Sequence, residues 1–396
     1  MKPRLLESYL LRDAGYYPVV TLTGPRQSGK TTLARSAFAG YQYVSLELID
    51  QRRFAQEDPR GFLAGIKGPA ILDEIQHVPD LLSYIQAAVD ENPAAGRFIL
   101  TGPHNFLLMS AVTQTLAGRC AILNLLPFSR AELEEQDQPE PQAPPGLFGN
   151  THTRLDLWPA LHAGFYPRIH DQGIPPAVWL EDYVRTYIER DVRSLSNIGD
   201  LNLFSRFLSL CAGRSAQLLN YSGLAADCGI SVDTARRWIS VLVASFIVFL
   251  LPPHHRNFNK RVIKSPKLYF YDTGLLCHLL GIRQADQLVN HPLRGPVFEN
   301  HVVAETAKAY THHRRTPPLF FWRDRSGREI DLIIEEAGAL FPVEIKSGMT
   351  VSSDMLDGLR WWTALSGQST ACATLVYGGG EFQTRHGIAV RPWFAI

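Results

Sequence analysis

The chain has 396 residues, with 39 Lys and Arg side chains against 38 Asp and Glu, so its formal net charge is +1. Hydrophobic residues make up 45% of the sequence and charged residues 19%, a composition typical of folded proteins and not of disordered ones. At roughly 100–200 residues per domain, this length predicts two or three domains. The balanced charge excludes a polybasic protein that binds nucleic acid through bulk charge, although one domain can still carry a local basic face.

The N-terminal residues, the length of the apolar runs and the cysteines favour a cytoplasmic protein without a membrane partner. Met1–Asp13 is charged and has no apolar segment of the signal-peptide type. The longest apolar run, Val241–Leu251, is about half the length of the roughly 20 residues that cross a bilayer as a helix. The five cysteines contain no CxxC pair, which favours reduced thiols over a disulfide framework or a zinc ribbon.

Residues 1–133 alternate strand-like and helix-like segments, the pattern of an α/β sheet. Pro18–Leu22 predicts a strand, Gly24–Thr31 fits the pattern G-x-x-x-x-G-K-[ST], and Thr32–Phe38 predicts a helix. In such a P-loop the backbone N–H groups and the helix N-terminus surround phosphate oxygens. The nucleotide-binding residues predicted here are Gly24, Pro25, Arg26, Gln27, Ser28, Gly29, Lys30, Thr31 and Thr32.

Two further elements complete a predicted site for ATP and Mg²⁺. We expect Lys30 to contact the β- and γ-phosphates and Thr31 to ligate Mg²⁺. Pro69–Glu74 predicts a buried strand that ends in two carboxylates. Asp73 is expected to hold the Mg²⁺ ion through water, and Glu74 to act as the general base of an ATPase. The alternative is an ordinary pair of surface acids at a strand end.

Two more polar residues are candidates for catalytic roles. Thr101 ends the predicted strand Arg97–Gly102 and is expected to sense the γ-phosphate or to orient the water, with a simple strand-to-loop cap as the alternative. Arg119 precedes the apolar segment Cys120–Leu126, where an arginine finger could reach the nucleotide of a neighbouring subunit. That interpretation requires a homo-oligomer, and its alternatives are an ordinary salt bridge or a phosphate contact within the same subunit.

A linker and a helical segment separate this module from the next. Residues 134–150 are predicted to form a linker or exposed loop, because Glu134–Gly149 holds four prolines and four acids but no Lys or Arg. Residues 151–215 are assigned to a helical lid or connector.

Residues 216–283 predict a winged helix-turn-helix. Ser222–Cys228 and Val232–Leu242 are the two predicted helices, and Pro252–Lys267, with five Lys or Arg and no acid, is the predicted wing. Such a face attracts a phosphate backbone, although winged helices also pack against proteins. The predicted DNA-binding residues are Arg236, Arg237, Arg256, Lys260 and Arg261.

Residues 284–396 predict an α+β module of the restriction-endonuclease-like fold. Glu299 lies on a predicted helix, and Asp331, Glu344 and Lys346 lie on strands of a predicted hairpin. The three carboxylates would bind Mg²⁺, and Lys346 would position or deprotonate a water molecule. The alternative is a set of exposed ion pairs on an edge strand.

The sequence resembles bacterial and archaeal ATPases that join an AAA-type P-loop core to a C-terminal domain of unknown function. The residues that carry this resemblance are Leu22–Leu33, Ile71–Gln76, Leu100–Gly102, Leu116–Arg119, Tyr187–Val192, Leu219–Trp238, Tyr269–Leu276 and Gly327–Gly348. The resemblance implies ATP binding with Mg²⁺, a core sheet with an additional strand, a winged helix and a nuclease-like tail. Pro103 and His104 depart from the small polar residues usual after Gly102, which leaves Asn105 as an alternative to Thr101.

The sequence as a whole therefore predicts an α/β P-loop ATPase whose nucleotide state controls a DNA-binding module that is also a candidate Mg²⁺-dependent nuclease. The alternative is a regulatory ATP switch without nuclease activity, in which the C-terminal domains are platforms for protein or DNA.

Overall fold

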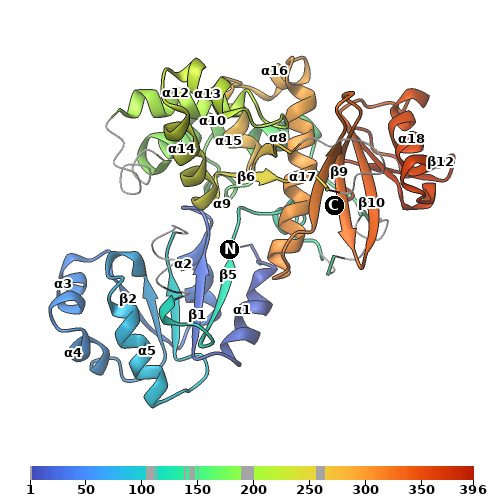
Figure 1. Ribbon diagram of the computed structural model, residues 1–396. Helices are drawn as coiled ribbons and strands as arrows, with labels where there is room; N and C mark the ends of the chain where they lie inside the picture. Colours follow the sequence, from blue (N-terminus) through green and yellow to red (C-terminus); the bar gives the residue numbers. More distant parts are fainter. Residues whose placement is uncertain are drawn as a thin grey trace. The chain divides into compact units, whose positions relative to one another are not determined.

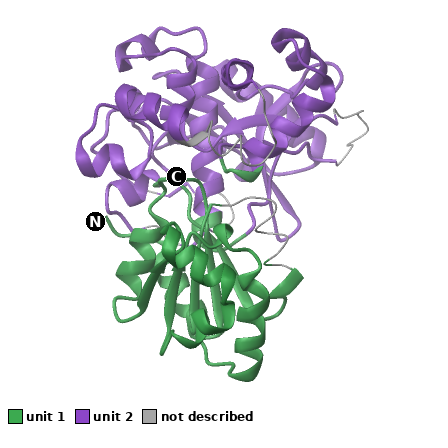
Figure 2. Ribbon diagram, turned by 90° about the vertical axis from the view of Figure 1, so that its left-hand side faces the viewer, with its two compact units in different colours: residues 1–128, 244–246, 311–315 green, residues 129–243, 247–310, 316–396 purple. Residues whose placement is uncertain are grey.

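The computed structural model divides the described part of the chain into two compact units (Figure 2). It describes residues 2–103, 112, 114–137, 140–141, 148–149, 151–188, 200–255 and 264–396. Unit 1 contains residues 1–128, 244–246 and 311–315, and unit 2 contains residues 129–243, 247–310 and 316–396. The first segment of unit 1 thus ends a few residues before the predicted boundary at 133, and the predicted middle and C-terminal modules share unit 2 except for residues 244–246 and 311–315.

Unit 1 is built on a parallel five-stranded sheet. Its strands are β1 (Val19–Thr23), β2 (Gln42–Ser45), β3 (Ala70–Asp73), β4 (Phe98–Thr101) and β5 (Cys120–Asn124), in the order β2-β3-β4-β1-β5. Strand β4 lies between β1 and β3, so the additional strand that the family resemblance implied is present. Strands β1, β3 and β4 are buried along their whole length, as expected of a sheet covered on both faces.

Helices cover both faces of this sheet (Figure 1). They are α1 (Leu6–Ala14), α2 (Lys30–Ala37), α3 (Ile49–Glu57), α4 (Pro59–Ala64) and α5 (Leu81–Glu91). Because side chains alternate along a strand, Val20 and Leu22 face a core with Leu6 of α1 and Leu33 of α2, whereas Val19 faces the core that contains α5. The carboxyl ends of the strands are therefore fixed at one edge of a three-layer sandwich.

Unit 2 begins with a mainly helical region. Its elements are α7 (Arg130–Leu133), α8 (Leu157–Ala163), α9 (Pro167–Gln172), α10 (Pro176–Tyr183), η2 (Val184–Ile188), α12 (Leu201–Ala212), α13 (Tyr221–Cys228), α14 (Val232–Ala244), β6 (Val248–Leu251), β7 (Lys267–Phe270), α15 (Thr273–Leu279) and α16 (Ala285–Val289). Strands β6 and β7 pair antiparallel. The apolar run Val241–Leu251 is split between the end of α14 and β6, and no described helix is both long and apolar enough to span a membrane.

The rest of unit 2 is a mixed six-stranded sheet between two helices (Figure 1). Its elements are α17 (Arg294–His312), β8 (Leu319–Arg323), β9 (Glu329–Glu336), β10 (Ala339–Lys346), α18 (Asp357–Ser366), β11 (Thr374–Tyr377), β12 (Gln383–Arg385) and β13 (Ile388–Pro392). The strand order is β12-β13-β11-β10-β9-β8, and β8, β9 and β10 are antiparallel neighbours. Val297 of α17 packs on one face with Val343, and Leu359 of α18 packs on the other with Leu340.

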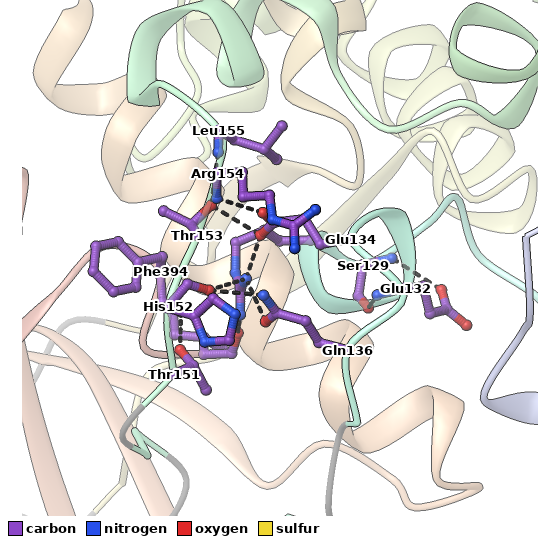
Figure 3. Close-up of polar contacts among 12 residues, drawn as sticks. Ser129, Glu132, Glu134, Gln136, Thr151, His152, Thr153, Arg154, Leu155 and Phe394 are labelled. Carbon is purple, nitrogen blue, oxygen red and sulfur yellow. Dashed lines mark hydrogen bonds and ion pairs between the residues drawn. The ribbon is translucent and has the colours of Figure 1, made fainter.

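The described residues at both ends of the predicted linker contact the rest of unit 2, so these ends differ from the exposed loop that was one of the two expectations. Arg130 is 1% exposed and donates to Glu134 Oε2 at 2.7 Å and to the Ile396 main-chain oxygen at 3.2 Å. The Glu134 carboxylate also accepts from Thr153 Oγ1 at 2.8 Å (Figure 3). Phe148, near the end of the segment, is buried. The acidic residue that suggested solvation is instead the partner of a buried guanidinium.

Removal of the Arg130 guanidinium should therefore destabilise unit 2. We expect Arg130→Met to lower the free energy of unfolding by about 3–5 kcal/mol, because Glu134 is left as a buried charge without its partner. Arg154→Met, at an exposed position of the same region, is the control and should change stability by about 0.5 kcal/mol or less. Urea unfolding followed by tryptophan fluorescence measures both. Equal unfolding midpoints for the two variants would contradict a structural role for this ion pair.

Candidate functional site

The loop after β1 has the backbone conformation that its glycines permit. Gly24 has φ +145°, and a Cβ atom there would lie 2.1 Å from the Leu125 carbonyl oxygen, so only glycine fits. Gly29 has φ +93° and caps the start of α2, which places Lys30 at the first position of the helix. The predicted strand–loop–helix order is therefore present, with the backbone turned around the N-terminus of α2.

Two cations hold the carbonyl groups of this loop. Lys30 Nζ donates to the carbonyl oxygens of Gly24 at 3.1 Å and Pro25 at 2.7 Å. Arg4 donates to the carbonyl oxygens of Ser28 at 2.8 Å and Leu126 at 2.6 Å. The ammonium group thus already lies at the phosphate loop. Arg4 is a supporting residue that the motif does not reveal, because it comes from outside the strand–loop–helix segment.

Asp73, at the end of β3, is the point where four elements meet. Its Oδ1 accepts from Thr31 Oγ1 of α2 at 2.9 Å and from Thr101 Oγ1 of β4. Its Oδ2 accepts from the Tyr43 hydroxyl of β2 at 2.7 Å. Three of these four residues were predicted site residues, and the structure brings them together because the carboxyl ends of parallel strands share one edge.

Tyr43 was missed by sequence reasoning, since an edge-strand tyrosine carries no motif. Burial, followed by the hydrogen bond to Asp73, raises the pKa of its hydroxyl to about 12. The hydroxyl therefore stays protonated at neutral pH and serves as a donor to the carboxylate. The Arg35 guanidinium lies 4.8 Å from the centre of the Tyr43 ring and helps to fix it.

Glu74 follows Asp73 in a left-handed backbone conformation, with φ 60°. A residue other than glycine holds this conformation at a cost of about 1–3 kcal/mol, and such residues cluster at functional sites. The Glu74 carboxylate accepts a hydrogen bond from the Gln76 amide, so its position is fixed beside the edge that holds Asp73.

Arg119 directly precedes β5, at the amino ends of the strands and therefore away from the carboxyl ends that hold Asp73. Its carbonyl oxygen accepts from the Val19 N–H at the start of β1, and its guanidinium pairs with both carboxylate oxygens of Asp90, at 2.5 and 3.0 Å. The structure therefore does not bring Arg119 to the loop of its own subunit. The arginine finger stays a prediction about a neighbouring subunit, and within one chain Arg119 forms the salt bridge weighed as its alternative.

The two helices predicted for DNA binding are present as α13 and α14. Gly229 ends α13 with φ 78°, and the Ser231 side chain accepts from the Thr234 N–H at the start of α14. Arg236 and Arg237 are exposed, and the Arg236 guanidinium lies 4.7 Å from the centre of the Tyr221 ring. The other predicted contacts, Arg256, Lys260 and Arg261, as well as Asn105, lie outside the described residues.

Lys267, predicted as a solvated basic residue of the wing, is buried, and this corrects the sequence prediction. It is 2% exposed, its Nζ donates to Glu299 Oε1 at 2.8 Å, and it forms a second ion pair with Glu329. Tyr269, also on β7, donates to the same Glu299 oxygen at 2.6 Å. Strand β7 thus places a cation among carboxylates of α17 and β9.

Glu299 and Asp331 interact with this cation, and Glu344 and Lys346 interact with these two carboxylates. Lys346 Nζ donates to Glu344 Oε1 at 2.5 Å, as two residues on the same face of β10 can, and Asp331 Oδ2 accepts from the Ile345 N–H at 2.9 Å. The predicted helix that carries Glu299 is present as α17, which begins at Arg294. We name Glu299, Glu329, Asp331, Glu344, Lys267 and Lys346 the carboxylate–lysine cluster.

Burial and like charge dominate the electrostatics of the carboxylate–lysine cluster. Burial raises the pKa of Glu299 and of Glu344, and the nearby Asp331 carboxylate raises both further. Burial acts to lower the pKa of Lys267, but Glu299, Asp331 and Glu329 outweigh it and raise that pKa. Within the described residues no three His, Cys, Asp or Glu side chains are arranged to hold a metal ion. The carboxylates are arranged around ammonium groups instead.

Comparison with protein families divides the chain into three parts. Residues 16–134 match a family described as an AAA domain. Residues 154–286 and 294–395 match two families described as domains of unknown function, DUF8612 and DUF4143.

Two solved structures are similar over much of the chain. The Walker-type ATPase of Pyrococcus abyssi is 15% identical, with 69% of this chain and 94% of that chain covered and a TM-score of 0.38. RuvB of Thermotoga maritima is 21% identical, with 62% and 87% covered and a TM-score of 0.33.

Two curated relatives match more closely in sequence. The uncharacterized proteins Rv2008c of Mycobacterium tuberculosis and Mb2031c of Mycobacterium bovis are each 32% identical over 338 residues, which cover 85% of this chain and 71% of the relative. The chain therefore belongs to the family of these two mycobacterial proteins, and it carries an AAA-type P-loop ATPase domain followed by two domains of unknown function.

Proposed function

We propose that the chain is a Mg²⁺-dependent ATPase whose nucleotide state controls a DNA-binding C-terminal region with a nuclease-like carboxylate–lysine cluster. The convergence of Thr31, Asp73 and Thr101 beside the phosphate loop carries the ATPase part. A hydroxyl and a carboxylate oxygen side by side are the hard donors that Mg²⁺ prefers, so the residues present fit the ion. When bound, Mg²⁺ would offset the charge that develops on the phosphates.

The roles of the surrounding residues follow from their positions. Lys30 would exchange the Gly24 and Pro25 carbonyls for phosphate oxygens, because an ammonium binds the fully charged acceptor more strongly. Thr101 is close enough to Asp73 to respond to the state of the γ-phosphate. Glu74, held by Gln76, would accept the proton of the attacking water.

DNA binding is proposed from the exposed arginines of α14. Helices α13 and α14 are followed by the antiparallel pair β6 and β7, an order that supports a winged helix-turn-helix. Arg236 and Arg237 share the exposed side of α14, where they can approach phosphate groups.

A regulatory switch without nuclease activity is the second candidate function. The observation that favours it is the pairing of Lys267 with Glu299 and Glu329, which fills the carboxylate–lysine cluster with a side chain of the chain itself. In that case the C-terminal region would be a binding platform whose charges are structural.

ATP hydrolysis tests the first part of the proposal. We expect Glu74→Gln to bind ATP but to hydrolyse it roughly 10²- to 10⁴-fold more slowly than the wild type, because the general base is lost. Lys30→Ala should lose ATP binding, and Glu57→Gln, at an exposed position of the same domain, should behave as the wild type. Phosphate release and binding of a fluorescent ATP analogue measure these effects. Unchanged hydrolysis by Glu74→Gln, or tight ATP binding by Lys30→Ala, would overturn the assignment.

Plasmid cleavage separates the two candidate functions. Plasmid DNA is incubated with Mg²⁺ or Mn²⁺ in the presence and absence of ATP. We expect the wild type to nick the plasmid when ATP is present and Asp331→Ala to lose this activity, since a metal-binding carboxylate is removed. Asp354→Ala, exposed in the same domain, should cleave as the wild type does. If the wild type and Asp331→Ala behave alike on every substrate, the nuclease part fails and the regulatory switch is the better interpretation.

A further inference from the structure

The Lys267 ammonium group is buried, so water cannot hydrate its charge. Lys267 begins β7, opposite Leu251 of β6, and it also bridges to Leu218. Lysine is almost never fully buried without a partner, because an isolated ammonium in a dry environment is very costly. The backbone pairing of β7 and the two carboxylates Glu299 and Glu329 together fix the position of Nζ.

The charges that face Lys267 come from every element packed against it. The acids that act on Lys267 are Glu299 of α17 and Glu329 and Asp331 of β9. Glu344 and Lys346 of β10 act on Asp331 and Glu299, and Arg323 of β8 pairs with Glu329. Arg323 is partly exposed and pairs with Glu329, and Lys346 pairs with Glu344. Lys267 is therefore the cation that compensates Glu299 and, at longer range, Asp331.

One acceptor of the carboxylate–lysine cluster has no hydrogen bond. Glu344 is 9% exposed, and its Oε2 atom is buried without a partner, whereas its Oε1 accepts from Lys346. A buried carboxylate oxygen in this condition is unfavourable unless a cation or donor reaches it. The carboxylate–lysine cluster thus has acceptor capacity beyond what its two lysines satisfy.

We propose that Lys267 is a built-in cation that keeps divalent metal ions out of the carboxylate–lysine cluster. Two cations cannot share the same buried carboxylates without strong repulsion, so metal binding by Glu299, Asp331 and Glu344 requires β7 to withdraw Lys267. The contact is therefore autoinhibitory, because β7 of the middle region prevents the C-terminal carboxylates from binding a metal ion. This inference rests on the nuclease-like assignment proposed above, and it adds a statement about how that site is controlled.

Manganese binding to the nucleotide-free full-length protein tests the inference without any activity assay. We expect Lys267→Met to bind Mn²⁺ about tenfold or more tightly than the wild type, by electron paramagnetic resonance titration, and the gain to vanish in the Lys267→Met, Asp331→Asn double variant. Lys267→Arg, which keeps the charge, should show no gain. Mn²⁺ should also raise the Tm of Lys267→Met but not that of the wild type.

Several results would overturn the inference. It fails if folded Lys267→Met binds Mn²⁺ no more tightly than the wild type, or if the wild type already binds Mn²⁺ tightly through Asp331. If Lys267→Met does not fold, Lys267→Gln also removes the charge and keeps a donor for Glu299, and an unchanged Mn²⁺ affinity in that variant also overturns the inference. Mn²⁺ binding by Lys267→Met without any DNA cleavage supports the inference and defeats the nuclease proposal. Tight Asp331-dependent Mn²⁺ binding by the wild type defeats the inference alone.

Discussion

The requirement that a buried charge be paired or fully hydrogen-bonded determines both sites of this chain. Asp73 is 5% exposed and accepts from Thr31, Thr101 and Tyr43, which ties α2, β4 and β2 to the end of β3. In unit 2, the buried Lys267 ties β7 to α17 and β9. In each unit a single charge thus joins elements that are distant in sequence.

Asp73 and Lys267, the two buried charges, differ in which groups could replace their present partners. Thr31 and Asp73 present oxygens beside a loop whose lysine donates to two neutral carbonyl groups, and in the proposed function a phosphate and its metal would improve the electrostatics there. In the carboxylate–lysine cluster the carboxylates already hold ammonium groups, so an incoming metal must displace one of them. We propose that the first arrangement accepts a ligand as it stands, whereas the second accepts a metal ion only after Lys267 is withdrawn.

How far the sequence predicts this molecule depends on how local each feature is. The phosphate loop was predicted correctly because Gly24, Gly29 and Lys30 act within one strand–loop–helix segment. The contact between Asp73 and Thr101 could also be predicted, since the carboxyl ends of parallel strands lie side by side. The contacts of Tyr43 and Arg4 could not be predicted, because they depend on strand order and on the segment before α1, outside the motif.

The errors in unit 2 have the same origin. Glu134 was interpreted as a solvated acid of an exposed linker, but its partner Arg130 is buried by the chain terminus and by α17. Lys267 was counted among the charges of a DNA-facing wing, but Glu299 and Glu329, more than thirty residues further along, remove it from solvent. A count of charges along a segment cannot reveal which of them are paired across the fold.

The most direct test of the central claim, that Asp73 is the metal-binding carboxylate of an ATP site, is the Mn²⁺ affinity of the complex with a non-hydrolysable ATP analogue. Asp73→Asn should lose the mutual enhancement of Mn²⁺ and nucleotide binding, since the charge that holds the ion is removed. Tyr43→Phe, which deletes only a donor to the other carboxylate oxygen, should retain most of it. Undiminished coupling of Mn²⁺ and nucleotide in Asp73→Asn would contradict the claim.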